Sequence, residues 1–151
     1  MEELLKRLNE AEVKFVVIGG QAMFQEGMPR FTIDWDFFIP SKDLVNFQRI
    51  NMAIGDELDM KLEPLDVLSE EGFVQTFQTR YGIIQFHLLT PGLGTFDDVY
   101  QRSVSRDYKG IQVKYLCLED LYASKMAVQR GKDSDDILFL KEKLRRKQSG
   151  C

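Results

Sequence analysis

The chain has 151 residues, of which 44% are hydrophobic and 29% are charged, and its formal net charge is −4. This length and composition indicate a folded domain that buries one sizeable core, and they exclude an intrinsically disordered protein. The negative charge argues against a protein whose main task is to coat nucleic acid, although a bound metal could supply the positive charge that a phosphorylated ligand needs.

The first part of the chain alternates between predicted helices and strands. Three leucines at helical spacing predict a helix over residues 2–11. The β-branched run "KFVVIGG" predicts a buried strand that ends in two glycines, and "QAMFQEG" predicts a short helix after it. "TIDWDFFIP" predicts a second strand, after which Ser41 is a suitable N-cap for a helix that runs to about residue 60.

The second part of the chain predicts a hairpin and then mainly helices. "FVQTFQTRYGIIQFHLLT" indicates two strands joined around residues 80–82, "GTFDDVYQRSV" a short helix, and "IQVKYLCL" a further strand. Two helices follow, with Asp133 able to cap the second. We therefore predict an α+β fold, in which a short mixed sheet is flanked by helices, with residues 1–151 as a single domain whose helical C-terminal part covers about 118–147.

The sequence also favours a cytoplasmic protein. No apolar run approaches the roughly 20 residues that a membrane helix needs, and the N-terminus lacks an apolar signal core. Two cysteines, Cys117 and Cys151, are too few for a disulfide framework, which is typical of a reducing compartment. We therefore expect no membrane partner.

Two short motifs carry the candidate chemistry. Gly19 and Gly20 end a strand and open a helix, where backbone N–H groups can approach an anion. After a spacer of thirteen residues, the next strand carries Asp34 and Asp36. In an extended strand these carboxylates point to one face, with Cα atoms about 6.5–7 Å apart, whereas Trp35 points to the other face. This spacing lets both carboxylates hold one hard divalent cation or flank a pair of cations about 3.5–4 Å apart.

The two motifs together resemble those of the DNA polymerase β-like nucleotidyltransferase superfamily, and in particular its minimal bacterial members related to abortive-infection and toxin–antitoxin systems. The matching residues are Ile18-Gly19-Gly20 and the aspartates of "IDWDF", and a later stretch, "LEDLYASKMAVQRGKDSDDI", is also similar. The resemblance implies a nucleotidyltransferase-like sheet, with the glycine turn on the triphosphate and Mg²⁺, or Mn²⁺ as a second possibility, on Asp34 and Asp36. The implied reaction transfers a nucleoside monophosphate from an NTP, with ATP as the first candidate, to an acceptor hydroxyl and releases pyrophosphate.

Further residues are candidates for nucleotide binding. The resemblance places Gln21 near the phosphates and lets Lys125 reach the triphosphate, although Lys125 could instead be a surface lysine. Arg30 and Thr32 precede the aspartates, where a guanidinium could meet phosphate oxygens or pair with the aspartates themselves.

Charged residues near the C-terminus have a structural interpretation. Arg130 and Lys132 could add positive charge to the same cleft or could simply favour a helix C-terminus. Capping and helix-dipole effects explain Asp133 and Asp136, and we interpret the basic run over 145–147 as a solvated helix end.

The chain departs from the family pattern at the third acidic position, which His87, its only histidine, occupies. Three interpretations stay open. His87 could be a substitute ligand or a general base for the acceptor hydroxyl, because imidazole accepts a proton near neutrality. It could mark a site that binds nucleotide without turnover, or it could be an ordinary hydrogen-bonded histidine at a sheet edge.

Two functions follow from these interpretations. The first is a metal-dependent nucleotidyltransferase with Asp34, Asp36 and His87 as its catalytic residues. The alternative is a weak or inactive nucleotide-binding module of the same fold that acts as an antitoxin-like or regulatory partner. The acceptor could be a protein, an RNA end or a small molecule, and a homo-oligomer or a toxin-like partner protein is also compatible with a small domain that has an open sheet edge.

Overall fold

A computed structural model describes residues 1–29, 32–64, 74–128 and 130–147, and of Lys132 it describes the backbone alone. Within these ranges a six-stranded sheet has the order β3-β4-β2-β1-β6-β5. The strands are β1 (Val16–Ile18), β2 (Trp35–Phe38), β3 (Val74–Thr79), β4 (Gly82–His87), β5 (Val104–Tyr108) and β6 (Ile111–Tyr115). The α-helices are α1 (Glu2–Glu10), α2 (Gly19–Gln25), α3 (Leu44–Ile54), α4 (Phe96–Arg102), α5 (Leu118–Val128) and α6 (Ser134–Arg146), and two 3₁₀ turns span Gly55–Glu57 and Gly131–Asp133. The predicted α+β fold is confirmed.

The sheet is mixed, and its two shortest strands lie at its centre. β1 pairs with β2 in the antiparallel sense and with β6 in the parallel sense, whereas β2 runs parallel to β4. The hairpins β3–β4 and β5–β6 form the two edges. In this register Ile18 is opposite Asp36, so the end of β1 lies directly beside the acidic strand.

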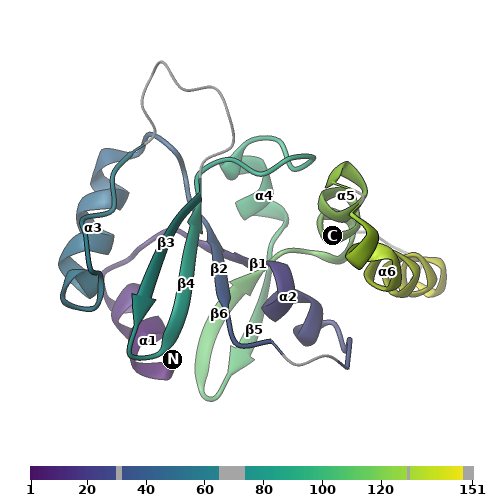
Figure 1. Cartoon of the computed structure of the whole chain (residues 1–151), viewed down its shortest axis with the longest axis horizontal. Coiled ribbons are helices and arrows are strands. Elements are labelled where there is room, and N and C mark those ends of the chain that lie inside the picture. The colour runs from purple at the N-terminus through teal and green to yellow at the C-terminus, as the bar shows by residue number, and fades with distance from the viewer. Residues whose placement is uncertain (30–31, 65–73, 129, 148–151) are drawn as a thin grey trace.

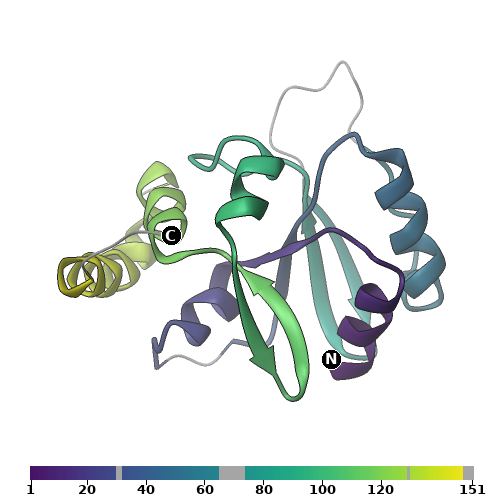
Figure 2. The ribbon, with the colours of Figure 1, turned by 180° about the vertical axis from the view of Figure 1, so that it is seen from behind.

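Helices pack against the sheet and also lie beyond it at both ends of the molecule (Figure 1 and, from behind, Figure 2). α1 packs against α3 and β6, while α2 packs against β1, β2 and α5, and α5 packs against α6. In Figure 1, α3 lies at one end of the molecule and the pair α5–α6 at the other. The β1–α2 connection therefore lies between the centre of the sheet and the helices that follow β6.

One face of the central strands is an aromatic core. The ring of Phe37 stacks on Phe86 with centroids 5.5 Å apart, and Phe15 meets Phe37 edge-on at the same distance. Trp35 is 4% exposed and contacts both Phe37 and Tyr108, with centroid separations of 6.1 and 5.0 Å. Aromatic pairs of this kind contribute beyond their buried area. Because odd-numbered residues of β2 occupy this face, Asp36 is directed to the other.

The start of α3 differs from the prediction. Its N-cap is Asp43, not Ser41, and the Asp43 carboxylate accepts a hydrogen bond from the backbone N–H of Asn46. The helix ends at Ile54, and Leu44 and Val45, at its first turn, are 62% and 54% exposed. A carboxylate at this position satisfies an otherwise unpaired N–H of the first turn, which fixes where the helix begins.

The edge strand β5 is an element that the sequence pattern does not predict. It joins β6 through Lys109 and Gly110, which have φ of +49° and +89°. Two successive positive φ values are the geometry of a tight turn that matches the twist of a hairpin. None of the described helices is long and apolar enough to cross a membrane. Cys117 is buried, whereas Cys151 lies outside the described residues.

Candidate active site

The turn between β1 and α2 requires glycine at two successive positions. Gly19 has a φ of +67°, and a Cβ added there would lie 2.7 Å from Oδ2 of Asp36. A Cβ on Gly20 would lie 2.6 Å from Oγ1 of Thr32. Both distances are shorter than any ordinary van der Waals contact. A side chain at either position would therefore collide with Asp36 or Thr32, and the backbone of the turn can lie this close only because both residues are glycines.

A cleft of about 390 Å³ opens beside this turn. Asp34 and Asp36 both line it, Asp34 from the position just before β2 and Asp36 from within the strand. The other lining residues come from the β1–α2 turn, the segment before β2, the strand β4, α5 and the turn that follows α5. They are Ile18, Gly19, Gly20, Thr32, Gln85, His87, Lys125, Arg130 and Asp133. The cleft therefore gathers most of the site residues predicted from the sequence.

His87 lies in this cleft next to Asp36. Its Nε2 atom is 2.8 Å from Oδ1 of Asp36, and both side chains are largely buried. β4 is flanked by β2 and β3, so His87 does not lie on an edge strand, whereas its contact with Asp36 agrees with the interpretation of an ordinary hydrogen-bonded histidine. The contact occupies one oxygen of Asp36 and leaves Oδ2 on the side of Gly19.

Gln21 is the one predicted site residue of known position that does not line the cleft. Its side-chain amide donates hydrogen bonds to the backbone carbonyls of Thr32 and Asp34, at 3.2 and 3.4 Å. These bonds tie α2 to the segment that leads into β2, so Gln21 supports the position of Asp34. Arg30, another predicted site residue, lies outside the described residues.

Two cations that line the cleft, Lys125 and Arg130, are paired with two buried carboxylates. Lys125 Nζ lies 3.2 Å from Asp133 and 3.1 Å from Asp136, and the guanidinium of Arg130 donates to both oxygens of Asp133. The hydrogen bond from Arg130, aided by that from Lys125, lowers the pKa of Asp133 from 3.8 to about 2. Asp133 is the N-cap residue of α6, as predicted, but its side chain makes no capping hydrogen bond. A buried carboxylate must be paired, and here the pairing takes precedence over capping.

Residues 1–149 match a protein family described as "Nucleotidyl transferase of unknown function (DUF2204)". The chain belongs to this family. Two solved structures of nucleotidyltransferase-like proteins share its fold. A predicted nucleotidyltransferase from Thermotoga maritima aligns with a TM-score of 0.68 at 15% identity, covering 97% of this chain and 91% of that one. An antigenic nucleotidyltransferase-like protein from Paracoccidioides brasiliensis aligns with a TM-score of 0.51 at 15% identity, covering 92% and 75%. No curated protein matches the sequence.

The donor set of this nucleotidyl transferase family member suits a cation that is shared with a ligand. No group of three or more His, Cys, Asp or Glu side chains in the described ranges could hold a metal by itself. Mg²⁺, however, usually binds through one or two carboxylates and completes its shell with water and substrate phosphates. Asp34 and the second oxygen of Asp36 fit that requirement, which a closed all-protein cage would not.

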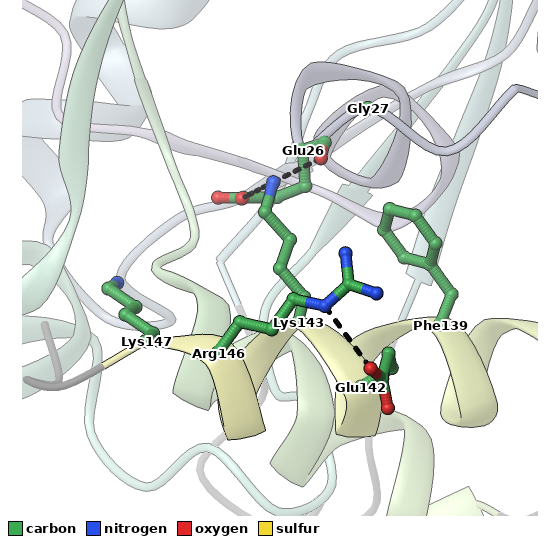
Figure 3. A pocket seen from close by; sticks show the side chains of 7 residues that line it. All are labelled: Glu26, Gly27, Phe139, Glu142, Lys143, Arg146 and Lys147. Atoms are coloured by element: carbon green, nitrogen blue, oxygen red, sulfur yellow. Dashed lines mark hydrogen bonds and ion pairs between the residues drawn. The ribbon is translucent and has the colours of Figure 1, made fainter.

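A second, larger pocket of about 740 Å³ lies between the end of α2 and the last turns of α6 (Figure 3). Lys143 crosses it to pair with Glu26, at 2.8 Å, and Arg146 pairs with Glu142 on its rim. Arg146 and Lys147, interpreted from the sequence as a solvated helix end, line this pocket. None of the predicted site residues lines this pocket.

Proposed function

We propose that this chain is a metal-dependent nucleotidyltransferase that transfers a nucleoside monophosphate from an NTP, with ATP as the first candidate, to an acceptor hydroxyl and releases pyrophosphate. One observation carries the proposal. The close glycine turn, the two aspartates and the two cations line one cleft of about 390 Å³. Membership of a nucleotidyl transferase family supports the same reaction class.

Each group of residues in the cleft would have a separate role in the reaction. Asp34 and Asp36 would hold a Mg²⁺ or Mn²⁺ ion, which when bound neutralises phosphate charge and polarises the reacting phosphoryl group. The turn at Gly19 and Gly20 has no side chains, so phosphate oxygens can approach its backbone. His87 holds one oxygen of Asp36 and thereby orients the other. Lys125 and Arg130 line the same cleft, and their N–H groups would favour the developing charge of the leaving pyrophosphate.

The family resemblance extends the proposal to a cytoplasmic protein of the abortive-infection or toxin–antitoxin type. An acceptor that is a protein, an RNA end or a small molecule would each present the hydroxyl that the reaction needs. A homo-oligomer or a toxin-like partner protein is also part of this proposal.

The test is the transfer of label from α-labelled NTPs, with Mg²⁺ or Mn²⁺, to a panel of proteins, RNA and small hydroxyl compounds. Asp34→Ala should lower transfer about 100-fold or more, because it removes a ligand that acts in the transition state. Asp59→Asn, at an exposed carboxylate outside the cleft, is the matched control and should match wild type. Metal-dependent nucleotide binding with no pyrophosphate release would overturn the enzyme and leave a binding module, whereas absence of nucleotide binding would overturn both.

A further inference from the structure

The two cations that line the cleft, Lys125 and Arg130, are held in different ways. Lys125 is 13% exposed, and its Nζ contacts carboxylate oxygens of both Asp133 and Asp136. An ammonium group has three N–H donors, so these contacts use two of them. Both partners are almost fully buried carboxylates, which balance the lysine's charge within the protein. Lys125 therefore has little capacity left for a ligand.

Arg130 keeps most of its binding capacity. It is 52% exposed, and it meets Asp133 side-on, through Nε at 2.9 Å and Nη2 at 3.4 Å. A guanidinium has five N–H donors in a rigid plane, so three have no partner among the described residues, including both of Nη1. The side-on contact with a buried, immobile acid also fixes the plane of the group, which reduces the rotamer freedom that ligand binding would otherwise cost.

We propose that Arg130, positioned by Asp133, is the residue that contacts the phosphate groups of the bound nucleotide, and that Lys125 braces Asp133 from the buried side. This inference rests on the proposed function and changes the role that the sequence suggested for Lys125. A planar guanidinium with free donors matches phosphate oxygens bidentately, whereas an ammonium held by two carboxylates would have to lose a partner first. Asp133 stays ionised at neutral pH, because its pKa is about 2, so the arrangement persists under working conditions.

The chain contains a matched pair that tests this inference. Arg102 donates to the buried Asp120 through Nε at 3.0 Å and Nη2 at 3.2 Å, and it is 40% exposed. This pair has the same Nε and Nη2 contacts as the pair between Arg130 and Asp133, with a carboxylate that is 12% rather than 3% exposed, and neither of its members lines the cleft. Arg102→Ala therefore removes the same charge and the same kind of contact, without touching the site.

The experiment measures binding of Mg·ATP and of inorganic triphosphate to the full chain by calorimetry, together with thermal unfolding. Arg130→Ala should weaken both ligands about 10- to 100-fold, the range expected for lost hydrogen bonds to a charged group, and Arg130→Lys should fall between it and wild type. Arg102→Ala should bind both ligands within about twofold of wild type while losing a similar amount of stability.

Four outcomes separate the possibilities. If Arg130→Ala binds triphosphate as Arg102→Ala does, the inference is wrong and the proposed function stands. The inference is also wrong if Lys125→Met, in a folded variant, loses ligand binding while Arg130→Ala keeps it. If the wild-type chain binds neither ligand, the proposed function fails and this inference fails with it. Loss of binding in Arg130→Ala without any transferase activity in wild type would support the inference and count against the reaction.

Discussion

Replacing Gly19 by alanine should damage the site by displacing Asp36. The substitution has two separable effects. Alanine at a φ of +67° costs about 1–2 kcal/mol of stability, because an L side chain is crowded in the left-handed region. The new Cβ would also lie 2.7 Å from Asp36 Oδ2, so the carboxylate must move by about 0.7 Å to reach an ordinary contact of 3.4 Å. A shift approaching 1 Å can cost on the order of 100-fold in rate.

Gly94→Ala tests the backbone strain alone, without a steric contact to Asp36. Gly94 has a φ of +77°, and a Cβ there would meet nothing within 4 Å. Both variants should therefore lose about 1–2 kcal/mol in denaturant unfolding, while only Gly19→Ala should also weaken metal-dependent nucleotide binding and slow the transfer reaction by up to about 100-fold. If the two variants lose equal stability and both bind nucleotide like wild type, the close approach of Gly19 to Asp36 does not shape the site.

Three further changes are expected to have measurable effects. His87→Asp should raise Mn²⁺ affinity about tenfold by calorimetry and lower the metal-free melting temperature, because it adds a carboxylate beside Asp36, and His87→Asn is the uncharged control. Equal Mn²⁺ affinity in the two variants would contradict this. The lowered pKa of Asp133, about 2 against 3.8, should contribute about 2 kcal/mol of stability that is fully present above pH 4 and is lost as the pH falls toward 2. Asp133→Asn should flatten that part of the pH–stability profile in urea unfolding, and an unchanged slope would refute the assignment. Gln21→Ala should cost about 1 kcal/mol, and Gln21→Glu should cost more because its carboxylate would face two carbonyl oxygens. Nucleotide affinity should fall in the same order, and an affinity that does not change would argue against a supporting role for this side chain.

The central strands and their motifs could be predicted because their signals are local. A β-branched run that ends in two glycines and an acidic pair that alternates with aromatic residues each specify a strand and its faces within a few residues. The pairing of Ile18 with Asp36 then follows from two consecutive strands in one sheet, which brings Gly19 to the carboxylates.

Other features depend on contacts that are distant in sequence. The middle of β5, residues 105–107, is exposed and polar, so it lacks the alternation that marks a strand, and its pairing with β6 stabilises it instead. The role of Lys125 could not be predicted from its own helix, because the two carboxylates that hold it come from the following turn and from α6. The competition between a cap and an ion pair at Asp133 is likewise decided by Arg130 and by burial.

Trp35, the chain's only tryptophan, is set between the two aspartates of the cleft in sequence and faces away from them into the core. Its indole rests edge-on against Tyr108 of the β5–β6 hairpin. Indole emission responds to its surroundings, so we expect a movement of this strand on ligand binding to change the fluorescence of this one residue. The fluorescence of Trp35 is therefore a suitable signal for ligand binding in the cleft, and every variant considered above retains this residue.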